Sequence, residues 1–141
     1  MGAYTTRRKG SDMRTLTITV YIHVEPDAVM AYASNPTHLP AWSPGFARSV
    51  TPDGAQWVVE MEEGTVRLWF SPPNADGILD HVVYLPNGDE VMNTMRVVSK
   101  GAGSEVSFLL HQREGMSETQ LHDDAARIQA DLHRLKALLE D

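Results

Sequence analysis

The sequence predicts an α+β fold in which a curved antiparallel sheet of about seven strands is wrapped around one long C-terminal helix. Two observations indicate this class. Short segments with strand-like alternation, separated by turn residues, follow one another from residue 14 to residue 112. The hydrophobic pattern then changes to a helical period that continues to the end of the chain. A run of strands followed by a helix is typical of α+β proteins, in which the helix covers one sheet face.

Residues 14–24 alternate apolar and polar side chains and are rich in β-branched residues, which predicts a long first strand with one buried face. Pro26 follows at the first position of a short helix. Asn35 and Pro36 have the types expected at the cap and first position of a second short helix. Two short helices in place of one long crossover argue against a doubly wound α/β fold.

The remaining strands are predicted as consecutive hairpins, because each is separated from the next by turn residues. Asn87-Gly88 is the clearest turn signal and predicts a two-residue type I′ turn. The expected strands are residues 47–51, 56–62, 65–71, 78–85, 90–99 and 105–112. Residues 1–13 are polar and aperiodic, so we expect a flexible N-terminal tail before a single domain at residues 14–141.

The C-terminal helix is expected at residues 117–139. Ser117 and Gln120 have capping-box spacing, and Met116 and Leu121 occupy the hydrophobic-staple positions. One apolar stripe runs along this helix through Leu121, Ala125, Ile128, Leu132, Leu135 and Leu139. A strongly curved sheet cannot close fully on one helix, so we expect a ligand cavity between them.

Composition narrows the possible partners. The net charge of −7 argues against nucleic acid or an anionic membrane. Cysteine is absent, which excludes disulfides, a thiol nucleophile and cysteine-ligated metal. The six histidines lack metal-site spacing, so no metal and no cofactor are expected. The chain shows neither a membrane-span pattern nor a signal-peptide pattern, and we expect a cytoplasmic protein that is a monomer or a weak homodimer.

The Asn87-Gly88 turn places Asp80 opposite Met95 and makes Asp80 and Asn93 diagonal neighbours on the face assigned to the interior. A buried carboxylate with a raised pKa could act as a general base, beside an amide that orients a carbonyl. Alternatively, backbone donors hold Asp80, or a bulge turns it outward.

If the register is shifted, His81 and Arg96 take the interior positions instead, and the polar site becomes basic. Amphipathic aromatic residues and the first half of the helix stripe complete the predicted site, with ordinary core packing as the alternative for the aromatic and methionine residues. The predicted ligand-binding residues are Tyr32, Trp42, Asp80, Tyr84, Asn93, Met95, Leu121, Ala125 and Ile128, with Asp80 as the catalytic candidate.

Several segments together resemble a known superfamily. They are Ile18-Thr19-Val20, Pro26-Asp27-Ala28-Val29, Asn35-Pro36, Trp42-Ser43-Pro44-Gly45, Leu79-Asp80-His81, Met95-Arg96-Val97, Gly103-Ser104-Glu105-Val106-Ser107-Phe108 and Gly115-Met116-Ser117. From residue 14 to residue 141 the chain resembles the START/Bet v 1-like superfamily (SRPBCC), which has the helix-grip fold, and within it bacterial polyketide cyclase/dehydrase-like proteins. This resemblance implies binding or transformation of hydrophobic small molecules. The cyclases of this group share no catalytic signature that could be carried over.

The sequence is compatible with three functions. The first is binding of a lipid- or polyketide-like molecule in the cavity. The second is a cyclase, aromatase or dehydratase that uses a buried Asp80 and holds a flexible chain in a reactive shape. The third is a protein-interaction module, which would require a large exposed apolar patch.

Overall fold

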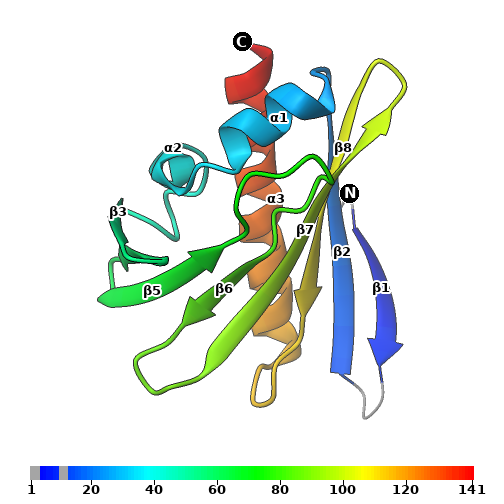
Figure 1. Cartoon of the computed structure of the whole chain (residues 1–141). Helices are drawn as coiled ribbons and strands as arrows, with labels where there is room; N and C mark the ends of the chain where they lie inside the picture. The colour runs from blue at the N-terminus through cyan, green and yellow to red at the C-terminus, as the bar shows by residue number, and fades with distance from the viewer. Residues whose placement is uncertain (1–3, 10–12) are drawn as a thin grey trace.

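A long C-terminal helix, α3 (Glu118–Glu140), lies against a curved antiparallel sheet in the computed structural model, which describes residues 4–9 and 13–141 (Figure 1). Within those residues, eight strands form the sheet in the order β1-β2-β8-β7-β6-β5-β4-β3. The strands are β1 (Tyr4–Lys9), β2 (Met13–Ile22), β3 (Ser49–Asp53), β4 (Gln56–Glu60), β5 (Thr65–Phe70), β6 (His81–Tyr84), β7 (Glu90–Lys100) and β8 (Gly103–His111). The predicted α+β class and helix-grip arrangement are confirmed.

The seven strands predicted after residue 13 are present as β2 to β8. In β2 the apolar positions face the core and the polar positions face outward, as the alternation predicted. Leu16, Ile18 and Ile22 are completely buried. β2 pairs with β8, so that Ile18 lies opposite Phe108. The first strand of the predicted domain therefore pairs with the last, and both strands contact α3.

The predicted flexible tail differs from the structure at residues 4–9. These residues form β1, which pairs antiparallel with β2 from Tyr4 opposite Ile18 to Lys9 opposite Met13. Strand β1 satisfies backbone groups that the outer edge of β2 would otherwise leave unpaired. Its polar sequence carried no alternation signal, because the pairing depends on backbone hydrogen bonds. The rest of the predicted tail, residues 1–3 and 10–12, lies outside the described residues.

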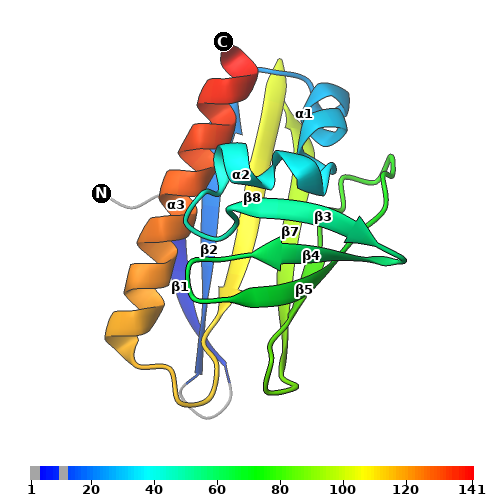
Figure 2. The same cartoon turned by 90° about the vertical axis from the view of Figure 1, so that its left-hand side faces the viewer.

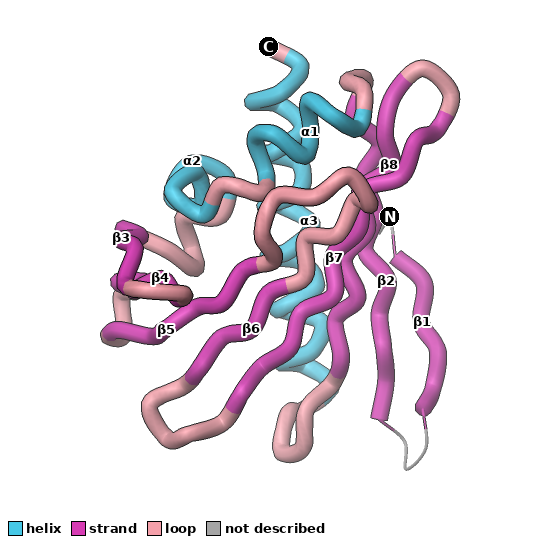
Figure 3. Tube along the Cα trace, in the orientation of Figure 1, coloured by secondary structure: helices cyan, strands magenta, loops and turns pink. Residues whose placement is uncertain are grey.

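Three short helical segments connect β2 to β3: α1 (Pro26–Ala33), the 3-10 helix η1 (Pro36–His38) and α2 (Leu39–Trp42). The cap predicted at Asn35 is present, because its side chain accepts a hydrogen bond from the Thr37 backbone N–H at 3.0 Å. Figures 1 and 3 place α1 and α2 toward the end of the sheet where α3 terminates. Figure 2 shows α2 beside α3, where it covers part of the space between helix and sheet.

Helix α3 begins with the predicted capping box. Ser117 Oγ accepts from the Gln120 N–H at 3.0 Å, and Gln120 Oε1 accepts from the Ser117 N–H at 2.9 Å. The predicted apolar stripe is buried from Leu121 to Leu135, and Asp131 is buried with it. None of the helices in residues 4–9 and 13–141 combines the length and the hydropathy of a membrane-spanning segment.

The register between β6 and β7 is shifted by one residue from the prediction. Leu85 N–H donates to Asp89 O at 2.9 Å, so residues 86–88 form a three-residue loop. Pro86 explains the shift, because a two-residue Asn87-Gly88 turn would need a backbone N–H at position 86. Gly88 instead ends the loop with φ of 96°. The shift reverses the faces of β6, and His81 now lies opposite Asn93.

Candidate functional site

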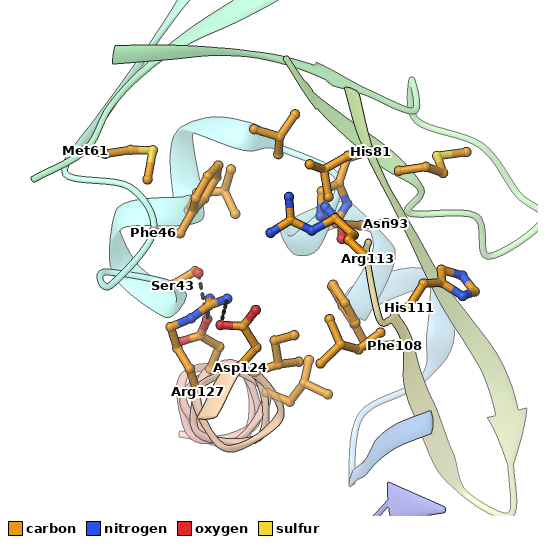
Figure 4. A pocket seen from close by; sticks show the side chains of 18 of the residues that line it. Ser43, Phe46, Met61, His81, Asn93, Phe108, His111, Arg113, Asp124 and Arg127 are labelled. Atoms are coloured by element: carbon orange, nitrogen blue, oxygen red, sulfur yellow. Dashed lines mark hydrogen bonds and ion pairs between the residues drawn. The ribbon is translucent and has the colours of Figure 1, made fainter. Parts of the chain in front are cut away.

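A cavity of about 420 Å³ lies between α2, α3 and the strands β6 to β8 (Figure 4). This volume is within the usual range for small-molecule sites. Most of its wall is apolar, from residues on the sheet, on α3 and in the segment after α2. The principal apolar lining residues are Leu39, Trp42, Phe46, Met61, Val83, Val91, Phe108 and Ile128. The flat, adaptable surfaces of aromatic and methionine side chains suit an apolar ligand.

His81 and Asn93 contribute polar groups on the sheet side of this cavity, from directly opposed positions on β6 and β7. His81 Nδ1 lies 3.0 Å from Leu79 O. A carbonyl only accepts hydrogen bonds, so Nδ1 carries the proton and Nε2 of the neutral ring carries a lone pair. The imidazole is stacked on Phe70, with ring centroids 5.0 Å apart and an interplanar angle of 2°. These contacts fix both the tautomer and the plane of the His81 ring.

Burial lowers the pKa of His81 below its ordinary value of 6.5. The hydrogen bond to Leu79 O and the charge of Asp80 act in the opposite direction but are weaker causes. The imidazole is therefore neutral at pH 7, and its Nε2, which has no hydrogen bond to a described residue, is available to accept one. The Asn93 amide has no hydrogen bond to any residue that the structure describes, so its donors and its acceptor are available.

Arg113 adds a positive charge where the loop between β8 and α3 borders the cavity. Figure 4 shows its guanidinium directed into the cavity. Arg113 is exposed, and none of the described residues forms an ion pair with it. His81, Asn93 and Arg113 thus retain unused hydrogen-bonding capacity.

The α3 side carries a second polar group, centred on Asp131, which is only 4% exposed. Ser43 Oγ donates to Asp131 Oδ2 at 2.7 Å, and Arg134 Nη1 donates to Asp131 Oδ1 at 2.7 Å. Arg127 lies 3.8 Å from Asp131 and 3.7 Å from Asp124. These charges satisfy one another, so the network ties the segment after α2 to α3 and leaves little for a ligand.

Burial raises the pKa of Asp131 above its ordinary value, while Ser43, Arg127 and Arg134 counteract part of this rise. Desolvation disfavours the charged carboxylate, whereas the donors and cations favour it. The Ser43 hydroxyl therefore stabilises the ionised form specifically.

Three of the predicted site residues line the cavity: Trp42, Asn93 and Ile128. Three others do not, because Met95, Leu121 and Ala125 are completely buried in the core. The small residue Ala125, predicted to bind ligand, therefore lies in the packed core and not at the cavity wall. Core packing, the alternative considered for the methionines, describes the place of Met95.

Two aromatic residues predicted to bind the ligand lie elsewhere. Tyr32 is stacked on His38, with ring centroids 4.1 Å apart. Tyr84 lies opposite Arg67 on the outer face of the sheet, because the register shift turned it outward.

Asp80 does not line the cavity. Its carboxylate forms an ion pair with Arg96 and accepts a hydrogen bond from the Met95 N–H at 3.0 Å. The alternative that backbone donors hold Asp80 describes this arrangement, and the placement as an interior general base is wrong. The shifted-register alternative correctly places His81 inside, but Arg96 remains outside with Asp80.

Sequence reasoning missed Asp131, Ser43, Phe46 and Arg113 as parts of the site. Asp131 was detectable in principle, because it lies three residues after Ile128 and directly before Leu132, at the edge of the buried stripe. Arg113 had no such signal, because its place depends on the path of the loop between β8 and α3.

A curved antiparallel sheet, a long C-terminal helix and an apolar cavity between them define a Bet v 1-like helix-grip protein. Residues 13–140 match the family described as "Polyketide cyclase / dehydrase and lipid transport". The chain therefore belongs to this family within SRPBCC, and the resemblance inferred from its sequence is confirmed. No sequence among the curated proteins matches it.

Solved structures share this fold at low sequence identity. A protein of unknown function from Enterococcus faecalis, EF2215, is 17% identical with a TM-score of 0.71, covering 97% of this chain and 77% of that one. DynU16, from the dynemicin biosynthetic locus, is 16% identical with a TM-score of 0.68, covering 89% of this chain and 47% of that one. Ara h 8.0201 is 14% identical with a TM-score of 0.62, covering 90% and 98%. At these identities the likeness concerns the fold.

Proposed function

We propose that this protein binds an apolar small molecule, lipid-like or polyketide-like, in the cavity between the sheet and α3. The observation that carries the proposal is the cavity itself, about 420 Å³ in volume and lined mainly by aliphatic, aromatic and methionine side chains. Small-molecule sites typically combine such walls with a few polar groups that orient the ligand. His81, Asn93 and Arg113 are polar groups of this kind.

The two other functions have less support. A cyclase or dehydratase that uses a buried aspartate is disfavoured at Asp80, because that carboxylate is paired with Arg96 outside the cavity. An interaction module is disfavoured because the large exposed apolar side chains in the described residues are dispersed. Met92 and Val98 lie six residues apart on β7, about 20 Å along the strand, and Leu138 lies near the end of α3.

Native mass spectrometry of freshly purified protein tests the proposal, using Val83→Trp and the matched control Val82→Trp. Val83 lines the cavity, whereas Val82 is its neighbour on the outer face of β6. We expect a co-purified or added apolar molecule to bind the wild type and Val82→Trp, and to be lost from Val83→Trp because the indole occupies the cavity. Equal binding by a folded Val83→Trp variant would place the ligand elsewhere.

A further inference from the structure

We propose that His81 and Asn93 form a subsite for a phenolic or enolic hydroxyl at the polar end of a flat apolar ligand. This inference rests on the proposed ligand binding and names the chemical group that the cavity selects. It requires an acceptor that cannot also serve as a donor, a nearby donor, and walls that match a flat molecule. The cavity provides all three.

His81 supplies the acceptor. The Nδ1 proton is directed to Leu79 O at 3.0 Å, so the neutral imidazole offers the cavity only the lone pair of Nε2. A ligand hydroxyl can donate to this nitrogen, whereas a ketone, ester or ether oxygen cannot. Stacking on Phe70 and a tilted contact with Phe108, at a centroid distance of 5.9 Å, hold the ring in place. This fixed orientation reduces the entropy that a hydrogen bond to Nε2 would cost.

Asn93 supplies the donor. Its position directly opposite His81 separates the two Cβ atoms by about 5 Å, as for facing residues on antiparallel strands. One hydroxyl oxygen can therefore donate to Nε2 and accept from the Asn93 amide. The amide has no competing partner among the described residues. Two hydrogen bonds to one oxygen distinguish a hydroxyl both from a methyl group and from a carbonyl.

The rest of the cavity favours a flat ligand with a weakly acidic hydroxyl. Phe46 and Phe108 present aromatic rings to the space beyond His81 and Asn93. The guanidinium of Arg113, which forms no ion pair with a described residue, also lines the cavity, and a positive charge close to the ligand makes a phenol or enol more acidic and a better donor. Asp80, which directly precedes His81 in the sequence, forms an ion pair with Arg96 and so does not neutralise the charge of Arg113.

Acidification should weaken the subsite. The charge that acts on His81 is that of Asp80, and its other neighbours are the neutral amide of Asn93 and the uncharged rings of Phe70 and Phe108. Glu90, His111 and Arg113 are the titratable groups that line the same cavity from β7, β8 and the loop after β8. Protonation of Nε2 converts it from an acceptor into a donor, so the hydroxyl loses its partner. Burial lowers the pKa of His81, so Nε2 is unprotonated at pH 7.5 and the preference for a hydroxyl should be fully present at that pH.

Calorimetric titration with 2-naphthol and 2-methylnaphthalene tests the inference, because the two probes differ by a hydroxyl in place of a methyl group. We expect the wild type to bind 2-naphthol about 10-fold more tightly at pH 7.5, from two hydrogen bonds of modest net strength. His81→Phe keeps an aromatic ring against Phe70 and should reduce this ratio to about one, with binding of 2-methylnaphthalene retained. Asn93→Leu should reduce the ratio several-fold, and Thr94→Val, on the opposite face of β7, should leave it unchanged.

A wild-type ratio near one, with both probes bound, would overturn the hydroxyl subsite and leave the proposed function intact. A ratio that survives His81→Phe would also overturn it. If His81→Phe fails to fold, Asn93→Leu provides the test. An unchanged affinity ratio in that variant would contradict a hydroxyl that is hydrogen-bonded to both His81 and Asn93. Failure of both probes to bind the folded wild type would overturn the subsite and count against the proposed cavity binding as well.

Discussion

Ser43→Ala should destabilise the protein more at neutral pH than at acidic pH. The substitution removes the 2.7 Å hydrogen bond from Ser43 Oγ to the buried carboxylate of Asp131. A buried hydrogen bond to a charged group contributes about 1.5–3 kcal/mol, and Arg134 remains as a donor, so we expect a loss of about 2 kcal/mol in the free energy of unfolding at pH 7.5. Once Asp131 is protonated, the lost bond is neutral and the loss should fall to about 1 kcal/mol.

The direction of the pH effect follows from the raised pKa of Asp131. In the wild type this residue contributes stability that is fully present below its unfolded-state pKa and is lost as the pH rises through its higher folded-state value. Removing Ser43 raises the folded-state pKa further, because the hydroxyl favours the ionised form. The stability difference between wild type and variant therefore widens as the pH rises.

Urea unfolding monitored by tryptophan fluorescence, from pH 4.5 to pH 7.5, measures this difference. Ser34→Ala is a matched control, because Ser34 is also buried but its hydroxyl has no hydrogen bond to a described residue. We expect the control to stay within about 0.5 kcal/mol of the wild type. A Ser43→Ala loss that is equally small, or that is identical at all pH values, would refute the coupling to Asp131.

Three further outcomes are expected. Asp80→Asn should lower the free energy of unfolding by about 1 kcal/mol, because it weakens the contacts to Arg96 and to the Met95 N–H. The affinity for an apolar probe, measured by titration, should not change, and a large loss of affinity would show that Asp80 belongs to the site. The wild type should lose stability as the pH falls below 6.5, because the pKa of His81 is lower in the folded than in the unfolded protein. In urea unfolding at several pH values, His81→Phe should reduce this dependence of stability on pH, and an unchanged dependence would contradict the role of His81. Gln120→Ala, which removes half of the capping box, should lower thermal stability by a few degrees in calorimetry, from about 0.5–1 kcal/mol, and an unaltered transition would show that the cap contributes little.

Local sequence signals were sufficient for most of the fold. Alternation in β2, the caps at Asn35 and Ser117 and the stripe on α3 are determined by neighbouring residues, and each is present in the structure. β1 escaped prediction because its pairing rests on the backbone of β2 rather than on an apolar face. The register of β6 and β7 was misjudged because the Asn87-Gly88 signal outweighed Pro86, which lacks the N–H that a two-residue turn needs.

The site was harder to predict, because one residue of register decides which side chains enter the cavity. Asn93 and Ile128 were placed on the correct faces of β7 and α3. Asp80 and Tyr84 were placed inside by the same register error that placed His81 outside. Two site residues come from loops whose paths depend on tertiary packing: Arg113, and Ser43, which is hydrogen-bonded to Asp131. No periodic pattern in the sequence indicates either residue.

Chemical-shift mapping with ¹⁵N-labelled protein and an apolar probe such as 2-methylnaphthalene is the most direct measurement of the central claim. If the ligand occupies the cavity between the sheet and α3, the largest amide shifts should occur at Phe46, Val91 and Ile128. Trp69 and Tyr84, which face outward from β5 and β6, should barely shift. Shifts concentrated on that outer face, or no shifts up to the solubility limit of the probe, would contradict cavity binding.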